Sequence, residues 1–326
     1  MSQNPIKLAV VGGDGIGPEV IEQGIRVLNK TGVALETTKY ELGGERYLKD
    51  QTILPDKILD EWRCLDAIYL GAVGHPDVTP GLIERGLLLK MRFDLDLYIN
   101  QRPFKTDKHD FVVVRENTEG SYAGEGGVLR KGTKHEVATQ GSVNTRMGVE
   151  RCIRYAFKLA EGRNKKVTLV HKTNVLSFSG DLWLRTFNEV SSEFPEVAVD
   201  YNHIDAACIY FVNLPEQYDV IVTDNLFGDI LTDLGGAISG GIGLASSANL
   251  NPDRTGPSMF EPVHGSAPDI AGQSKANPIA AILSGALMLD FFGFSQEAQQ
   301  IADACYACSE ISGSTSEIGD AVIAKL

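Results

Sequence analysis

Runs of apolar residues alternate along the chain with amphipathic stretches, and this alternation limits the folds that the sequence can adopt. Strand-like runs occupy residues 7–12, 66–74, 110–116, 166–176 and 218–230, and helical patterns lie between most of them. Runs rich in Val, Ile and Leu are typical of strands that are buried on both faces of a parallel sheet. The order of these elements therefore predicts an α/β architecture with mostly parallel sheets.

The composition is that of a globular protein that carries no membrane segment. The chain has 326 residues, of which 43% are hydrophobic, enough for one large core or two medium ones. Its longest apolar stretch, residues 278–289, is interrupted by Ser284 and Gly285 and is too short to cross a bilayer. The first residues lack the pattern of a signal peptide, and the five cysteines are an odd number that suits a reducing compartment. We therefore expect a cytoplasmic protein.

The charge balance restricts the possible partners. There are 43 acidic and 30 basic residues, which gives a formal net charge of −13. Such a surface repels nucleic acid and acidic membranes, so we expect neither as a partner. An anionic small ligand would need a local cluster of basic residues. Cys305 and Cys308 form a CxxC pair, but no second pair accompanies it, so a structural role is favoured over a metal or redox role.

A glycine-rich segment, VVGGDGIGPEV at residues 10–20, lies between the first strand-like run and a helical pattern. A dinucleotide-binding turn requires G-x-G-x-x-G, and Gly13 and Gly15 supply its first two glycines. Pro18 occupies the third position, where a glycine would allow close packing of helix and strand. The segment is therefore interpreted as a strand-to-helix turn, and a cofactor is expected to bind elsewhere.

Two aspartates indicate a metal site. Asp229 and Asp233 are four residues apart and follow a strand-like run, so on a helix their carboxylates share one face. Carboxylate oxygens are hard ligands that suit Mg²⁺ or Mn²⁺. A solvated helix face is the alternative, and the apolar surroundings make the two interpretations about equally supported.

Three arginines adjoin segments that resemble core elements: Arg92, Arg102 and Arg115. A guanidinium group binds a carboxylate in a bidentate manner, so three converging arginines would form a pocket for a di- or tricarboxylate. Taken singly, each arginine is more often a surface ion-pair residue. Together with the aspartates they suggest metal-assisted chemistry on an anionic acid.

A series of ordered motifs strengthens this interpretation. These are GDGIGPEV, LDLYINQRP, VVVRENTEGSYAGEGG, HKTNVL, DNLFGDILTDLGG and EPVHGSAPDIAGQSKANP. With them the chain resembles, from about residue 7 to about residue 293, the metal-dependent β-decarboxylating dehydrogenases. That family includes the isopropylmalate, isocitrate, homoisocitrate and tartrate or D-malate enzymes.

The resemblance implies a two-domain fold of the isopropylmalate dehydrogenase type, which differs from a standard Rossmann domain. The first domain would contain residues 1–97 and 240–326, and the second residues 98–239. An arm near residues 117–138 would exchange across a homodimer. The glycine- and serine-rich stretch at 235–258 is expected to be a hinge or loop, and the stretch beyond Phe294 to be helical.

The resemblance also implies roles for individual residues. Arg92, Arg102 and Arg115 would clamp the substrate carboxylates, and Tyr122 and Lys172 would transfer protons. Asp229 and Asp233 would bind Mg²⁺ or Mn²⁺ together with Asp205 of the partner subunit, which would also lie near the substrate. Lys172 would likewise come from the partner, so that the two subunits share each active site. The coenzyme would be held by His264, Gly265, Ser266, Ala267, Pro268, Asp269, Ile270 and Asn277. The carboxylate of Asp269 would accept hydrogen bonds from the ribose hydroxyl groups and repel a 2′-phosphate, which favours NAD over NADP.

The choice of substrate depends on an apolar wall formed by Leu87, Leu88 and Leu89. This wall favours NAD-dependent oxidative decarboxylation of 3-isopropylmalate, a reaction of leucine biosynthesis. The alternative is a D-malate or tartrate dehydrogenase of the same family, and a non-catalytic relative that binds metal or anions is less favoured. Two features depart from the family pattern. The segment between Arg102 and Arg115 is short, and His171 precedes Lys172, where we assign it a structural role.

Overall fold

The computed structural model describes residues 4–326 and divides the chain into two compact units. The first unit comprises the segment that ends at Leu97 together with Ser239–Leu326. The second unit is the continuous segment Tyr98–Ile238. The first unit is therefore built from two stretches of chain that are distant in sequence.

The sheet of the first unit has the strand order β2-β1-β3-β12-β11. These strands are β1 (Ile6–Gly13), β2 (Leu35–Lys39), β3 (Ala67–Ala72), β11 (Ser246–Leu250) and β12 (Ser258–Pro262). Strands β2, β1, β3 and β12 run parallel, whereas β11 is antiparallel to β12. The carboxyl ends of the parallel strands therefore meet at one edge, where ligands bind in open α/β sheets.

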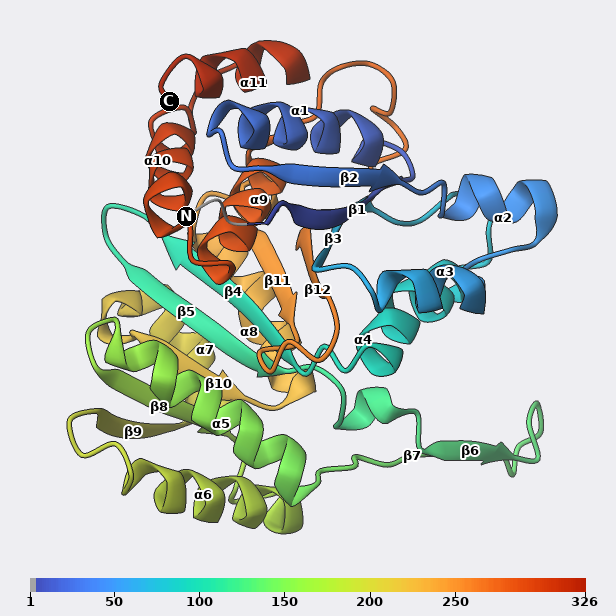
Figure 1. The fold of residues 1–326 in the computed structure, drawn as a ribbon. Coiled ribbons are helices and arrows are strands. Elements are labelled where there is room, and N and C mark those ends of the chain that lie inside the picture. The colour runs from blue at the N-terminus through green and yellow to red at the C-terminus, as the bar shows by residue number, and fades with distance from the viewer. Residues whose placement is uncertain (1–3) are drawn as a thin grey trace. The chain divides into compact units, whose positions relative to one another are not determined.

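The helices of the first unit include one that is buried on all sides. They are α1 (Gly17–Lys30), α2 (Gly44–Asp50), α3 (Asp56–Trp62), α4 (Lys90–Asp94), α9 (Ile279–Phe291), α10 (Ser295–Tyr306) and α11 (Thr315–Ile323), with a π-helical turn at Glu84–Leu89 and a 3₁₀ turn at Ile242–Leu244. Helix α9 packs against β11 and β12 and also contacts α1 and α10 (Figure 1). This position explains why α9 is the longest apolar stretch. No helix within residues 4–326 combines the length and apolar character that crossing a membrane requires.

The second unit has a sheet of similar design, with the strand order β4-β5-β10-β8-β9. The strands are β4 (Ile99–Lys105), β5 (Asp110–Glu116), β8 (Lys166–His171), β9 (Ala198–His203) and β10 (Val220–Thr223). Strands β5, β10, β8 and β9 are parallel, and β4 forms an antiparallel hairpin with β5. The carboxyl ends of the parallel strands again lie at one edge.

Helices cover both faces of this second sheet. Helix α5 (Arg146–Glu161) crosses in front of the strands and α8 (Asn225–Ile238) lies behind them in Figure 1. The remaining helices are α6 (Ser177–Ser191), α7 (Ile204–Asn213) and 3₁₀ turns at Ser121–Ala123 and Pro215–Gln217. A hairpin of β6 (Gly126–Leu129) and β7 (Val137–Gln140) extends away from the body of the unit (Figure 1). All residues of both hairpin strands are exposed.

The α/β architecture with mostly parallel strands is confirmed, as are the helices beyond Phe294. The prediction of a loop over residues 235–258 is wrong in part. Helix α8 continues to Ile238, and Ser246–Leu250 forms β11, whose residues are all buried. Small polar residues can occupy a buried strand here because partners satisfy them, as when the Asn249 amide donates to Glu261 at 2.8 Å.

Candidate active site

The glycine-rich turn after β1 brings three segments of the first unit into close contact. The Asp14 amide donates to Ala72 at the end of β3, and the Ile16 amide donates to the Ser266 carbonyl at 2.9 Å. Gly15 has φ of +58°, and a Cβ there would lie 2.0 Å from the Ser266 oxygen. Glycine is thus required because the backbone of the predicted coenzyme loop lies against the turn. Pro18 lies in the first turn of α1, as expected.

Asp14 organises this edge of the first unit, a role that sequence reasoning missed. Its side chain is 1% exposed. The carboxylate accepts hydrogen bonds from the amides of Gly44 at 2.8 Å, Glu45 at 3.1 Å and Gly74 at 2.9 Å. One aspartate therefore joins the turn after β1, the start of α2 and the loop after β3. Its place inside a glycine-rich turn was the available signal, since such turns use carboxylates to hold neighbouring amides.

The predicted coenzyme loop follows β12 at this same carboxyl edge. Ser266 is buried, whereas Gly265, Pro268 and Asp269 are exposed and His264, Ala267 and Ile270 are half-buried. Ala267 has φ of +39°, a conformation that is uncommon for a residue with a side chain. The side-chain oxygen of Asn277 accepts a hydrogen bond from the amide of Ile279, the first residue of α9. The loop is thus fixed at its ends, and its exposed middle presents backbone and the Asp269 carboxylate.

A second group of predicted residues meets at the carboxyl edge of the second unit. Arg115 lies on β5, Tyr122 on the 3₁₀ turn after β5, and Asp229 on α8 after β10. One carboxylate oxygen of Asp229 accepts a hydrogen bond from Nη1 of Arg115, and the other accepts one from the Tyr122 hydroxyl at 2.8 Å. The Arg115 guanidinium also lies 5.1 Å from the centre of the Tyr122 ring. The structure therefore brings together three residues that were predicted to serve as a carboxylate clamp, a proton-transfer residue and a metal ligand.

The electrostatics of this group assign different protonation states to its acids. Burial raises the pKa of Asp229, but Arg115 and the Tyr122 hydroxyl outweigh that effect, so the pKa lies below its usual value. Burial and the hydrogen bond to Asp229 raise the pKa of Tyr122. At neutral pH the group thus contains an ionised carboxylate and a phenol that retains its proton.

Asp233 and Arg102 extend the group along α8. Arg102 on β4 is 7% exposed and donates from Nη1 to the Thr232 hydroxyl at 2.7 Å. The same nitrogen lies 3.9 Å from the Asp233 carboxylate, which is largely exposed. Asp229 and Asp233 therefore occupy the helix face that the spacing predicted. Within residues 4–326, no group of three or more His, Cys, Asp or Glu side chains is arranged to hold a metal, so the chain's own acids do not complete a ligand set.

Lys172 and Asp205 form a separate pair in the second unit. Lys172 follows β8, and Asp205 lies in the first turn of α7, which follows β9 directly. His171 and His203 are register partners in these parallel strands. Nζ of Lys172 donates to the Asp205 carboxylate at 2.5 Å, and this bond lowers the pKa of Asp205. Lys172 and Asp205, which are both expected to reach into the active site of the partner subunit, thus lie together.

Arg92 and the leucines belong to the first unit. Arg92 on α4 is 8% exposed, and its Nη2 lies 3.6 Å from the Glu261 carboxylate. Leu87 is completely buried in the core, so the apolar wall prediction is wrong for this residue. Leu88 and Leu89 are half-buried on the π-helical turn. Three consecutive residues on a helical turn point in different directions, which is why Leu87 lies inside the core, whereas Leu88 packs against its edge and Leu89 is half-buried.

His171 is completely buried directly before Lys172. Its ring stacks on Trp183 at 5.8 Å and meets Phe227 edge-on, and its Nε2 lies 3.5 Å from the Asp224 carboxylate. Burial lowers the pKa of His171 to about 4 and raises the pKa of Asp224 to about 6. Below pH 6 Asp224 therefore loses the charge that would hold a protonated imidazole.

We expect the stability of the wild-type protein to fall relative to His171→Phe as the pH falls from 6.5 to 4. In the unfolded chain the imidazole takes up a proton near pH 6.5, whereas in the folded protein it resists protonation until about pH 4. The unfolded state therefore binds more protons in this window, and the difference should approach about 3 kcal/mol. Urea unfolding of both proteins across this range measures it, and parallel stability curves would contradict the prediction.

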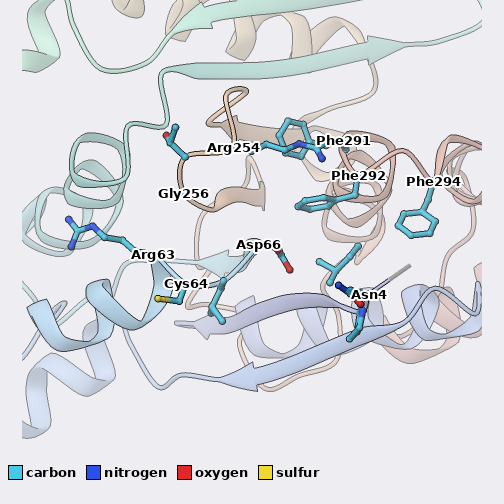
Figure 2. A pocket seen from close by; sticks show the side chains of 13 residues that line it. Asn4, Arg63, Cys64, Asp66, Arg254, Gly256, Phe291, Phe292 and Phe294 are labelled. Atoms are coloured by element: carbon cyan, nitrogen blue, oxygen red, sulfur yellow. Dashed lines mark hydrogen bonds between the residues drawn. The ribbon is translucent and has the colours of Figure 1, made fainter. Parts of the chain in front are cut away.

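The other candidate features lie outside these groups. A cavity of about 440 Å³ in the first unit is lined by residues that include Asp66, Arg254, Phe291 and Phe292. Figure 2 shows the Arg254 side chain beside Phe291 and Phe292. The cavity lies where β1, β3 and β12 begin, at the edge opposite the predicted coenzyme loop. It contains no predicted site residue.

The CxxC cysteines are buried. Cys305 and Cys308 are completely inaccessible to solvent, and neither forms a disulfide. Burial raises the pKa of the Cys305 thiol, which opposes the thiolate form that metal binding and redox exchange require. Their burial in the first unit favours the structural role.

Comparisons with known proteins identify relatives over almost the whole chain. The family model described as isocitrate/isopropylmalate dehydrogenase matches residues 7–324. A 3-isopropylmalate dehydrogenase of Corynebacterium glutamicum is 57% identical, with 98% of this chain and 99% of the relative covered. An enzyme of the same name from Thermobifida fusca is 56% identical, with 93% and 91% covered.

Solved structures show the same fold. The isocitrate dehydrogenase from Methylococcus capsulatus has a TM-score of 0.89 at 36% identity, covering 98% of this chain and 99% of that one. A β-decarboxylating dehydrogenase from Thermococcus kodakarensis has a TM-score of 0.85 at 37% identity, covering 98% and 96%. The expected fold type is thereby confirmed. The chain belongs to the isocitrate/isopropylmalate dehydrogenase family.

Proposed function

We propose that this chain is an NAD-dependent, Mg²⁺- or Mn²⁺-dependent dehydrogenase that converts (2R,3S)-3-isopropylmalate to 4-methyl-2-oxopentanoate and CO₂ in leucine biosynthesis. Its relatives named 3-isopropylmalate dehydrogenase, at 55–57% identity, support this substrate. The observation that carries the proposed chemistry is the group of Arg115, Tyr122 and Asp229, because it combines an anion-binding cation, a protonated phenol and an ionised carboxylate.

The donor set fits a divalent metal. Asp229 and Asp233 offer carboxylate oxygens one helical turn apart, and the pKa of Asp229 is lowered, so this ligand is ionised. Asp205 of a second copy would supply a further oxygen. When bound, Mg²⁺ or Mn²⁺ acts as a Lewis acid toward the substrate's hydroxyl and carboxylate oxygens.

The remaining residues bind substrate and move protons. Arg92, Arg102 and Arg115 are proposed to bind the two carboxylates. Lys172 of a second copy would accept the proton of the substrate hydroxyl, for which its amine must first have given up its own proton, and NAD, when bound, would supply the hydride acceptor. After the β-carboxylate has left as CO₂, the Tyr122 hydroxyl gives a proton to the carbon from which it departed. The raised pKa of Tyr122 suits it for this donor role.

NAD is proposed to bind along the loop of residues 264–272 with Asn277. The exposed Asp269 carboxylate would accept hydrogen bonds from the adenosine ribose and repel a 2′-phosphate. The contact between Ile16 and Ser266 holds this loop in place before the coenzyme arrives. Preformed backbone of this kind reduces the ordering cost of binding.

A homodimer is the proposed working unit, because Lys172 and Asp205 would act in the site of the other copy. Exposed apolar side chains on α7 and α8 support self-association: Ile209 is 59% exposed, Val212 62% and Ile230 48%. The exposed β6–β7 hairpin also carries Val128, Leu129 and Val137 and is the proposed exchanging arm. Leu88 and Leu89 are proposed to contact the substrate's isopropyl group.

The rate of NADH formation with 3-isopropylmalate, D-malate and isocitrate, each with Mg²⁺ and with EDTA, tests the proposal. The isopropyl group adds three carbons over malate, which at about 0.8 kcal/mol each predicts an advantage of at least about ten-fold in kcat/KM. Activity should vanish with EDTA and return with Mg²⁺ or Mn²⁺. Equal or faster turnover of D-malate would transfer the assignment to the D-malate or tartrate enzymes. An inactive protein would indicate a non-catalytic relative.

A further inference from the structure

The first turn of α8 holds Arg115 through a buried asparagine. Asn225, the first residue of the helix, is 1% exposed. Its side-chain oxygen accepts two hydrogen bonds from one edge of the guanidinium, from Nε at 3.0 Å and from Nη2 at 2.6 Å. Its side-chain nitrogen donates to the Glu119 carbonyl at 3.1 Å. Asn225 thus connects β5, the loop that leads to Tyr122 and the helix that carries Asp229.

A glycine one turn later makes room for the same arginine. A Cβ at Gly228 would lie 2.4 Å from Cγ and 2.6 Å from Cβ of Arg115. These distances are far shorter than a van der Waals contact, so even alanine would displace the aliphatic part of the arginine. Glycine inside a helix costs about 1 kcal/mol relative to alanine, and nothing in the backbone of α8 requires it. The packing of Arg115 explains its presence.

The charge of the acceptor matters as much as its position. An amide oxygen orients the Nε and Nη2 edge without neutralising the guanidinium, whereas a carboxylate there would form an ion pair with it. Nη1 is left on the side where it bonds to Asp229. Because Arg115 is 1% exposed and held along its length, the Nη1 end of its guanidinium has one direction available, toward Asp229.

We propose that Asn225 and Gly228 are positioning residues for Arg115. This proposal rests on the function proposed above. The two residues fix the direction of the guanidinium without placing a second carboxylate beside it in addition to Asp229, while the bond from Asn225 to Glu119 holds the loop before Tyr122. The arginine is thereby preorganised and does not have to be ordered by the substrate.

Asn225→Ala and Gly228→Ala test the inference through a comparison of the KM for the hydroxy acid with the KM for NAD. For each, we expect the KM for 3-isopropylmalate to rise at least about ten-fold, since the clamp loses its orientation, while the KM for NAD changes by less than about two-fold. Asn251→Ala and Gly162→Ala are matched controls. Asn251 is an equally buried asparagine in the first unit, and a Cβ at Gly162 would approach no atom closer than 3.7 Å. Both controls should leave the two KM values unchanged.

A double-mutant cycle separates positioning from general structural support. In an Arg115→Lys background, which lacks the fork that Asn225 binds, Asn225→Ala should lower kcat/KM by less than about two-fold further. An equal loss in both backgrounds, or equal increases in both KM values, would overturn the inference while leaving an active wild type and its proposed function intact. A wild type that is inactive on every hydroxy acid would overturn the proposed function, and this inference with it.

Discussion

Replacing Lys172 by methionine is expected to lower kcat by about 100-fold or more while leaving the fold intact. Proton transfer by a positioned side chain typically contributes 10²- to 10⁴-fold. Methionine retains most of the length and apolar stem of lysine but has no ammonium group, so the Asp205 carboxylate loses its 2.5 Å partner. Stopped-flow and steady-state measurements of NADH formation at saturating substrate would report the loss as an effect on kcat.

Lys166→Met is the matched control for this experiment. Lys166 begins the same strand, β8, and its Nζ lies 3.5 Å from the Asp200 carboxylate on the neighbouring β9. This pair is partly exposed and should contribute little, so kcat should stay within about two-fold of the wild type. A Lys172→Met enzyme that retained more than about a tenth of the wild-type kcat would exclude Lys172 as the proton-transfer residue.

Asp229→Asn is expected to weaken metal binding by about 100-fold or more and to reduce activity accordingly. The substitution preserves size but removes the charge that Arg115 and Tyr122 now stabilise. An amide is also a poorer ligand for a hard cation than a carboxylate. Activity measured against Mg²⁺ concentration, and calorimetric titration with Mn²⁺, would both show the shift.

Asp181→Asn serves as the control for the change in net charge. Asp181 lies on α6 in the second unit, where it is exposed and lies 3.5 Å from Arg185. Its replacement should leave the Mg²⁺ dependence unchanged. If Asp229→Asn shows the same half-saturating Mg²⁺ concentration as Asp181→Asn, Asp229 is not a metal ligand.

Mixing the two inactive proteins distinguishes shared from self-contained sites. A dimer of one Lys172→Met subunit and one Asp229→Asn subunit would contain one site with both changes and one site with neither, if the two residues act in different copies. Random exchange of subunits makes half of the dimers hybrid, so recovery of roughly a quarter of the wild-type activity is expected. Absence of recovery after exchange has been verified would place both residues in the same copy's site.

Local sequence patterns alone predicted several of the strands and the helix face that carries the two aspartates. The continuous apolar runs at β1 and β5 indicate strands that are buried on both sides, and the structure confirms this. The spacing of Asp229 and Asp233 specifies a shared helix face. Pro18 at the position of the third glycine predicted the start of a helix, and it lies in the first turn of α1. Each of these inferences needs only residues that are neighbours in the chain.

Tertiary structure decided the features that depend on which strands become neighbours. Ser246–Leu250 is a strand because β12 and α9 bury it, although its composition is that of a loop. Leu87 faces the core because the π-helical turn at Glu84–Leu89 packs against the first unit. Asn225 and Gly228 contact Arg115 because β5 and β10 are adjacent in the sheet. This pairing places the start of α8 against Arg115, although Asn225 lies 110 positions later in the chain. Sequence periodicity reports which side of an element is buried, whereas the identity of the atoms on that side is set by long-range packing.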